Sequence, residues 1–191
     1  MKSLSNKFII LLLSCFMVFT AKAEDVPIVV SASWLKDHLH DKNLVLLHVD
    51  WTKFDYDREH IPTAQYLWPY SLAPNTPYGN MNAPDTQEAT RLLQGYGISN
   101  DTHVVLYFTQ NNVTVTSRMF LTLEYLGLKG RVSLLDGGMN AWTKDGNSLT
   151  AEVPTVKKGN FKAGINPILV DKEYVFKNLE SDKTTIVDAR F

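Results

Sequence analysis

The chain of 191 residues is 45% hydrophobic and has 19 basic and 20 acidic side chains. Three of the basic residues and none of the acidic ones lie in the first 23 residues, so the remaining 168 residues carry 16 basic and 20 acidic side chains, a net charge of −4. This balance argues against nucleic acid or an anionic membrane as a partner. A chain of that length suffices for one ordinary domain and part of another.

The first 23 residues have the three parts of a secretory signal peptide. Lys2 and Lys7 precede an apolar run over residues 8–19, and Ala-Lys-Ala follows just before residue 24. This run of 12 residues is shorter than the roughly 20 that a membrane-spanning helix needs. Cys15 raises the alternative of a lipoprotein signal, but the residues after it stay apolar, which disfavours that alternative. We expect cleavage after Ala23 and a periplasmic or secreted protein without a membrane span.

Cysteine usage restricts the chemistry further. The only cysteine is Cys15, within the segment that we expect to be removed. The mature protein would then have no thiol, no disulfide and no cysteine metal site. Any thiol chemistry must come from elsewhere.

Strand and helix patterns alternate along the rest of the chain. Ser31 or Ser33 can cap one helix, and Asp85 with Glu88 three residues later marks the start of another. Nearly continuous apolar runs are typical of strands buried on both faces. The expected strands cover residues 27–30, 43–49, 64–69, 103–107 and 131–135, and the expected helices cover 31–39, 85–97, 112–127 and 138–146, with an irregular connection over 71–85. This order predicts an α/β fold, a parallel sheet with helices on both faces.

The end of the chain repeats the pattern of its beginning. Residues 30–50 align with residues 170–188, each with a polar cap, an aromatic residue (Trp34 or Tyr174), a charged turn, an apolar strand and an aspartate. Such a succession is common, so the match alone leaves chance open. If the repeat is real, a second copy begins near Asn166 and the chain ends just after the first buried strand of that copy.

Two motifs resemble the signatures of the rhodanese family. They are YDREHIPTAQYL at residues 56–67 and LLDGGMNAWTKDG at residues 134–146, at the spacing that the family uses. The resemblance covers residues 26 to about 150, and IVDAR at 186–190 is similar to the opening strand of a following rhodanese-like domain. It implies the non-catalytic N-terminal domain of a tandem-domain thiosulfate or 3-mercaptopyruvate sulfurtransferase.

The expected domain organisation follows from this resemblance. It has a signal peptide at 1–23, a rhodanese-like domain at 24–150, a linker at 151–165, and the first helix and strand of a truncated second rhodanese-like domain at 166–191. We expect residues from about Gly159 onward to be poorly anchored, because the last apolar strand lacks partners.

The motif residues favour structural roles. His60 and Pro62 are expected in a turn in which Pro62 fixes the backbone and His60 bonds main-chain groups. Gly137 and Gly138 permit a sharp strand-to-helix turn, and Trp142 is expected in the core. A metal site of His60 with the acids Asp50, Asp55, Asp57 and Glu59 is the alternative. The spacing of those acids fits no ligand pattern, so we expect a solvated loop, with no metal and no cofactor.

Phe108 stands where the resemblance places the catalytic residue. In active rhodanese-like domains the nucleophilic cysteine follows the strand that here covers residues 103–107, and a helix N-terminus lowers the pKa of its thiol. Thr109, Thr114 and Ser117 are nearby hydroxyls, but we expect no histidine or acid beside them to act as a base. We therefore expect no catalytic residue in this chain, with Phe108 occupying the nucleophile position.

The ring of Phe108 has two expected placements. It can fill the space of a persulfide and weaken anion binding, or it can face a missing second domain as part of an apolar patch. We favour the second, because the residues 110–112 are too polar to bury the ring and paired domains of this family meet near that loop.

Three functions stay open. The chain can be an inactive part of a sulfurtransferase, a non-catalytic rhodanese-like binding or interaction module in the periplasm, or one half of an enzyme whose second domain comes from a partner chain. A small sulfur donor is expected only where a second domain is supplied, and a partner chain or domain is expected at the Phe108 loop.

Overall fold

The computed structural model describes residues 26–77, 79–110 and 112–188, so the expected signal peptide lies outside the described residues. At its centre is a five-stranded sheet in the order β1-β5-β4-β2-β3, with every pairing parallel. The strands are β1 (Val29–Val30), β2 (Leu44–Val49), β3 (Gln65–Leu67), β4 (His103–Tyr107) and β5 (Val132–Leu135). The α/β fold expected from the alternating pattern is confirmed.

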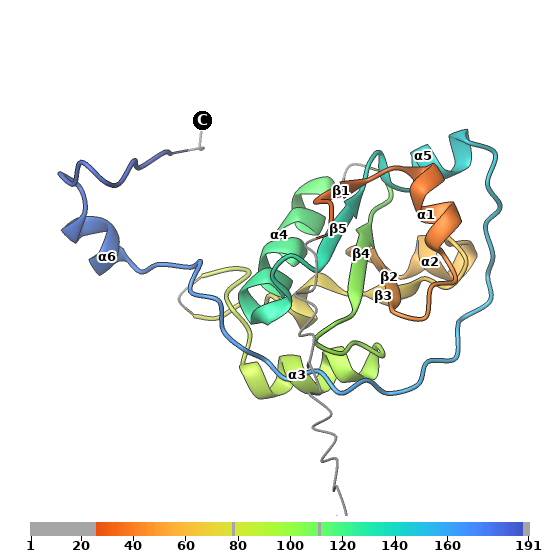
Figure 1. The fold of residues 1–191 in the computed structure, drawn as a ribbon, viewed down its shortest axis with the longest axis horizontal. Coiled ribbons are helices and arrows are strands. Elements are labelled where there is room, and N and C mark those ends of the chain that lie inside the picture. The colour runs from red at the N-terminus through yellow and green to blue at the C-terminus, as the bar shows by residue number, and fades with distance from the viewer. Residues whose placement is uncertain (1–25, 78, 111, 189–191) are drawn as a thin grey trace, which may run out of the picture.

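Helices cover both faces of this sheet (Figure 1). On one face lie α1 (Ala32–His38), α2 (Phe54–Arg58) and α5 (Gly138–Lys144), and on the other lie α3 (Thr86–Gly95) and α4 (Val113–Leu123). A short π-helical segment, η2 (Glu124–Leu128), extends α4, and a 3-10 helix, η1 (Pro69–Ser71), follows β3. The sequence pattern did not predict α2 or η1, because neither is long enough to show a helical period.

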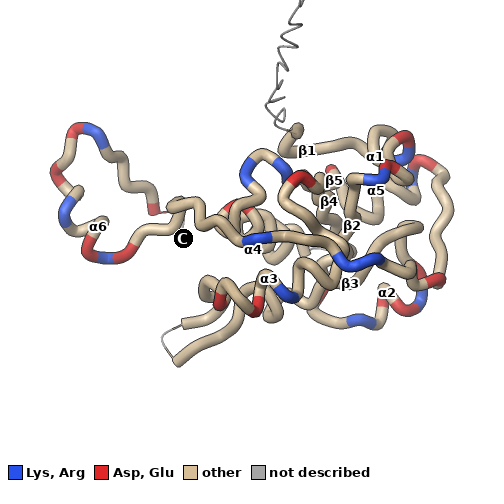
Figure 2. The backbone as a smooth tube through the Cα atoms, turned by 60° about the horizontal axis from the view of Figure 1, so that its bottom comes forward, with Lys and Arg blue, Asp and Glu red and all other residues tan. Residues whose placement is uncertain are grey.

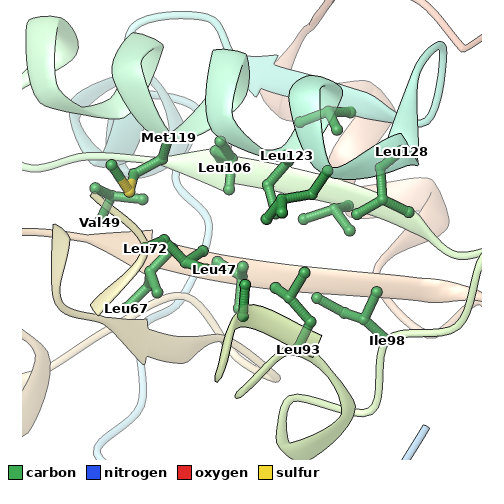
Figure 3. Close-up of a cluster of buried hydrophobic side chains, with 14 of the residues drawn as sticks. Leu47, Val49, Leu67, Leu72, Leu93, Ile98, Leu106, Met119, Leu123 and Leu128 are labelled. Carbon is green, nitrogen blue, oxygen red and sulfur yellow. The ribbon is translucent and has the colours of Figure 1, made fainter. Parts of the chain in front are cut away.

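The sheet separates two hydrophobic cores. Because side chains alternate along a strand, Leu47 and Val49 of β2 pack toward α3 and α4, whereas Leu46 packs toward α1 and α5. Figure 3 shows the first core, in which Met119 of α4 and Leu93 of α3 lie with Leu47 of β2 and Leu106 of β4 on one face of the sheet. The sheet is therefore covered on both faces, as its continuous apolar strands require.

Side-chain caps begin α1 and α3 where the sequence predicts them. The Ser31 hydroxyl accepts a hydrogen bond from the Trp34 N–H at 3.1 Å. The Asp85 carboxylate accepts from the N–H groups of Gln87 and Glu88, each at 2.9 Å. Both caps satisfy donors that a helix leaves free in its first turn.

The segment after α5, residues 150–166, is called the strap here. Thr150 pairs with His60 in an antiparallel bridge, with N–H···O distances of 2.8 and 2.9 Å. Further along, Phe161 is fully buried in the first core, and its N–H donates to the carbonyl of Ile98 at 3.2 Å. The packed part of the domain thus continues beyond Thr150.

The expectation of poor anchoring from Gly159 onward is wrong as far as Asn166. The N–H of Gly159 donates to the carbonyl of Gln94 at 2.9 Å, and the N–H of Asn166 donates to the carbonyl of Tyr125 at 2.8 Å. The single buried ring of Phe161 holds the strap, and one aromatic residue in a polar stretch gives no periodic signal in the sequence.

Beyond the strap, α6 (Lys172–Lys177) is capped by Asp171, whose carboxylate accepts from the Tyr174 N–H at 2.7 Å. None of its residues is buried, and Figure 1 shows it away from the sheet. It coincides with the helix expected in a second copy. The described residues up to Asp188 form no strand after α6, so the second copy stays a prediction.

Within the described part of the chain, no helix is both long and apolar enough to cross a membrane.

Candidate functional site

Asp50 and Thr109 meet at the carboxyl ends of two neighbouring strands. β2 and β4 are parallel with His48 opposite Tyr107, so the residues two positions further on also face each other. The Thr109 hydroxyl donates a hydrogen bond to the Asp50 carboxylate, and the two residues are only 6% and 5% exposed. The expectation that no acid lies beside Thr109 is therefore wrong. This hydroxyl is buried, however, so its role is to bond the neighbouring carboxylate.

His48 lies beneath this pair and is fully buried. Its ring stacks on Tyr107 with centroids 4.7 Å apart, and its Nε2 is 3.9 Å from the Asp50 carboxylate. Neither ring nitrogen has a hydrogen-bond partner among the described residues. Burial lowers the pKa of His48 to about 4, although the nearby Asp50 charge opposes that effect and His60 adds to it. The imidazole is therefore neutral near pH 7.

Phe108 sits directly after β4, at the position that the resemblance assigns to the nucleophile. Its side chain is half-buried, and its carbonyl accepts from the Met139 N–H at 2.9 Å. Gly137 and Gly138 turn the chain from β5 into α5 with φ of 67° and 56°, which confirms their expected role. A Cβ on Gly138 would lie 3.1 Å from Cδ2 of Phe108. The half-buried ring thus lies against this turn. It is neither fully buried in the loop nor fully exposed, which were the two placements that the sequence left open.

The loop after Phe108 leads into α4. Gln110 has a left-handed backbone with φ of 50°, and the Asn112 N–H donates to the carbonyl of Thr109 at 3.2 Å. No side chain caps α4 at Asn112. Of the other hydroxyls named from the sequence, Ser117 donates to the carbonyl of Val113 at 2.9 Å. The hydroxyl proton of Ser117 is therefore used in a hydrogen bond within α4.

A pocket of about 370 Å³ opens beside this loop. Its side chains come from the loop after β2, from the irregular connection before α3 and from the start of α4: Trp51, Met81, Asn112, Thr114, Val115 and Arg118. Arg118 donates twice to the carbonyl of Met81, at 2.8 and 3.2 Å, and once to the Thr122 hydroxyl at 2.6 Å. Its guanidinium therefore ties the irregular connection to α4.

Exposed aromatic side chains surround the same edge of the sheet, and the sequence reasoning missed them. Trp51 is 40% exposed and Trp68 48%, and the ring of Tyr70 contacts both, at centroid distances of 5.2 and 5.4 Å. Phe54, at the start of α2, is 70% exposed. Trp51 and Trp68 come shortly after β2 and β3, so the rule that parallel strands share one carboxyl edge could have placed them together. We call Trp51, Phe54, Trp68 and Tyr70 the aromatic surface.

The motif residues take the structural roles expected of them. The His60 ring nitrogens lie 2.7 Å from the Tyr56 carbonyl and 3.1 Å from the Glu152 carbonyl. Trp142 is buried and donates from its indole to the Ser148 carbonyl at 2.9 Å. Contacts with main-chain groups thus explain both residues without a ligand.

The acids around His60 are dispersed among separate partners. Asp55 lies 3.4 Å from Arg58, and Asp57 lies 2.8 Å from Lys53. Across the residues that the structure describes, no three His, Cys, Asp or Glu side chains are grouped so that they could hold a metal ion. At this edge the described residues thus place exposed aromatic side chains near the buried pair of Asp50 and Thr109.

The comparisons with known proteins agree on one family. Residues 31–145 match the family model described as the rhodanese-like domain. The sulfur carrier protein TtuD of Thermus thermophilus is 35% identical over 136 residues, which cover 71% of this chain and 46% of TtuD. A thiosulfate sulfurtransferase of Rattus norvegicus is 28% identical over 174 residues, 84% of this chain and 58% of that protein. This chain spans about half the length of the curated relatives that it matches.

Solved structures share the fold. SseA from Escherichia coli, a 3-mercaptopyruvate sulfotransferase, superposes with a TM-score of 0.74 at 22% identity, over 86% of this chain and 66% of that chain. Wild-type EanB superposes with a TM-score of 0.70 at 22% identity, over 84% and 42%. At such identities these matches show the fold alone. The family match covers more than half of the residues, and this chain therefore belongs to the rhodanese-like domain family.

Proposed function

We propose that this chain is the non-catalytic N-terminal half of an exported tandem sulfurtransferase, which moves a sulfane sulfur from thiosulfate or 3-mercaptopyruvate. A second rhodanese-like domain, in the same polypeptide or in a partner chain, supplies the cysteine. The small sulfur donor binds only where that domain is present.

The observation that carries this proposal is the residue after β4. Phe108 stands at the head of α4, where the family resemblance calls for a nucleophilic cysteine, and a phenyl ring can hold no persulfide. The only cysteine of the sequence is Cys15, in the expected signal peptide. The neighbouring hydroxyl of Thr109 is buried and donates its proton to the Asp50 carboxylate.

The surface around Phe108 supports a partner domain at this edge. Trp51, Phe54 and Trp68 are exposed there, and Val113 at the start of α4 is 46% exposed. Apolar groups gathered around one loop are typical of an interaction site. We infer that the cysteine-bearing domain packs on the aromatic surface beside Phe108.

Export is part of the same proposal. The charged start, the apolar run and the Ala-Lys-Ala end of residues 1–23 support cleavage after Ala23 and a periplasmic or secreted location. Mass spectrometry of the exported protein should then show Glu24 as the first residue. An N-terminal, lipid-modified Cys15 would establish the lipoprotein alternative instead.

An activity assay tests the sulfurtransferase half of the proposal. The purified mature chain, with thiosulfate and cyanide, should form thiocyanate no faster than buffer, while an active rhodanese assayed in parallel serves as the positive control. Thiocyanate formation above the buffer rate in metal-free protein would refute the proposal. The coding sequence downstream of Phe191 provides a second test, because it should encode a rhodanese-like domain with a cysteine if the halves are in tandem.

The alternative is a non-catalytic rhodanese-like interaction module in the periplasm, which the exposure of the aromatic surface favours on its own. Under that alternative the partner brings no sulfur-transferring cysteine. Mixing the chain with a purified partner distinguishes the two, because only the sulfurtransferase proposal predicts that the mixture forms thiocyanate.

A further inference from the structure

His48 is a fully buried histidine whose ring has no hydrogen-bond partner among the described residues. Most buried polar groups in native proteins are paired, so an unpaired imidazole calls for an explanation. The ring stacks on Tyr107, with centroids 4.7 Å apart, and its centroid lies 5.9 Å from that of Tyr56. Both neighbouring rings are buried as well. The imidazole is therefore held in one place with two unused nitrogens.

The Asp50 carboxylate faces both His48 and Thr109. Its Oδ2 lies 3.9 Å from Nε2 of His48, about 1 Å longer than a charge-assisted hydrogen bond. The same Oδ2 accepts the Thr109 hydroxyl proton, while Oδ1 accepts the Thr52 N–H at 3.3 Å. A protonated His48 would therefore place a charged donor beside an oxygen that already accepts from Thr109.

The bond between Asp50 and Thr109 ties the loop after β4 to the end of β2. Asp50 directly follows β2, and Thr109 is the second residue after β4. The next residue, Gln110, has a left-handed backbone with φ of 50°, which costs free energy in a residue with a side chain. Trp51, which follows Asp50, belongs to the aromatic surface. A shift of Asp50 would therefore reach both the loop and this surface.

Titratable and charged groups approach His48 from several elements. They are Asp50 after β2, Asp55 and Tyr56 on α2, His60 after α2, and Tyr107 on β4. Burial lowers the pKa of His48 to about 4, with Asp50 and Asp55 opposing this effect and His60 adding to it. Burial raises the pKa of both tyrosines, so they stay neutral in acid. Figure 2 shows red acidic and blue basic positions together at α2, where Asp55 lies 3.4 Å from Arg58. Because Asp55 has this partner, Asp50 is the acid that a protonated His48 would contact.

Of His48 and Asp50, the carboxylate is the group that can move. The His48 ring is stacked among buried aromatic rings, whereas Asp50 lies outside β2, at the start of a loop. We propose that His48, Asp50 and Thr109 form an acid-sensitive switch, in which protonated His48 draws the Asp50 carboxylate away from Thr109 and releases the loop that begins at Phe108. The proton comes from solvent, and no covalent bond of the chain changes. Only the effect of this switch on a partner domain rests on the proposed function.

Amide shifts of the isotopically labelled mature chain, followed from neutral pH to below the His48 pKa of about 4, test the switch. The amides of Thr109 and Gln110 should shift with the same midpoint as the carbon signals of the His48 ring. The amide of Leu93, which is buried on the other face of the sheet, should not change, because the fold stays intact. His48→Phe should abolish the transition at Thr109 and Gln110.

His103→Gln is the matched control. Burial lowers the pKa of His103 to about 4 as well, but this residue begins β4, and its ring lies 2.8 Å from the Ser133 hydroxyl. The variant removes a histidine that titrates in the same range, and it should leave the transition at Thr109 and Gln110 unchanged. An equal loss of the transition in His103→Gln and His48→Phe would overturn the proposal, since it would mean a general response to acid.

Thr109→Val keeps the shape of the side chain and removes its hydroxyl. The Asp50 carboxylate is then free to face His48, so the His48 ring should still titrate, with a higher midpoint, and the amide of Gln110 should no longer follow it. A transition at Gln110 that persists in His48→Phe or in Thr109→Val would overturn the proposal, as would a shift of Leu93 at the same midpoint. These measurements use this chain alone, so their result is independent of the thiocyanate assay that tests the proposed function.

Discussion

The carbonyl and ring of Phe108 occupy the space that a side chain on Gly138 would need. A Cβ on Gly138 would lie 2.5 Å from the Phe108 carbonyl oxygen and 3.1 Å from ring atom Cδ2. The same carbonyl accepts the Met139 N–H, so the loop after β4 and the start of α5 are held as one unit. A side chain at residue 138 would force these two segments apart.

We expect Gly138→Ala to destabilise the domain more than Gly146→Ala. Both glycines have positive φ, 56° and 73°, so both substitutions carry backbone strain. Only Gly138 also faces a steric clash, since nothing lies within 4 Å of a Cβ at Gly146. Overpacking of this kind costs roughly 1–3 kcal/mol. Urea denaturation of the two variants should show that difference in the free energy of unfolding, and equal values would contradict the contact.

Local signals in the sequence predicted most of the fold. The caps at Ser31 and Asp85 act within one helical turn, and the apolar run of β2 indicates a strand buried on both faces. Both features can therefore be predicted from neighbouring residues alone. The strap could not be predicted in this way. Its anchors, such as Phe161 on Ile98, join segments far apart in the chain, and nothing local marks them.

The candidate site was predicted only in part for the same reason. The position of Phe108 came from a motif, whereas the pairing of Thr109 with Asp50 joins residues 59 positions apart and depends on strand register. Parallel strands with aligned carboxyl ends imply such a pair once β2 and β4 are known to be neighbours. The sequence shows both strands but not their order in the sheet.

Burial also lowers the pKa of His103 to about 4, so the free energy of unfolding should fall as the pH falls from about 6.5 to about 4, with His48 accounting for part of the change. The pKa of His48 is about 4 in the folded protein and near 6.5 when unfolded, so the unfolded chain binds more protons in this window. The stabilisation is fully present above pH 6.5 and is lost as the pH drops toward 4. A shift of this size corresponds to on the order of 3 kcal/mol.

Substitution of His48 measures this contribution. His48→Phe keeps a ring against Tyr107 and removes the titrating group, so its unfolding free energy should vary less between pH 6.5 and 4. His40→Gln, at an exposed position, should leave the pH dependence of the parent protein unchanged. If the unfolding free energy of His48→Phe varies with pH as steeply as that of the parent protein, other groups cause the acid sensitivity.

Phe161→Ala should destabilise the whole domain. The side chain is fully buried in the first core, and truncation of a buried phenylalanine costs about 3–5 kcal/mol. Val153→Ala is the control on the same strap, because that side chain is 65% exposed and should change the free energy of unfolding by less than about 0.5 kcal/mol. Equal stability of the two variants, measured in urea, would mean that the strap is not part of the cooperative unit.

Phe108→Cys tests whether the loop still favours an anion. The start of α4 has no side-chain cap, and a helix N-terminus lowers the pKa of a nearby thiol. Two features oppose this effect: residue 108 is half-buried, and the next residue, Thr109, bonds the Asp50 carboxylate, whose charge disfavours a second anion. We expect the opposing features to dominate, so the thiol should titrate at or above ~8.5, the value of an unperturbed cysteine.

The rate of alkylation by iodoacetamide against pH gives the pKa of the Phe108→Cys thiol, and Ser148→Cys, at an exposed position, is the reference thiol. Adding Asp50→Asn to the Phe108→Cys variant removes the opposing charge and keeps an oxygen that can accept the Thr109 proton. The thiol pKa of this double variant should therefore be lower than that of the single variant. If Phe108→Cys alone reacts fast with a pKa well below that of Ser148→Cys, the anion-binding geometry of the loop is intact. Phe108 would then stand in a loop that can still stabilise a thiolate.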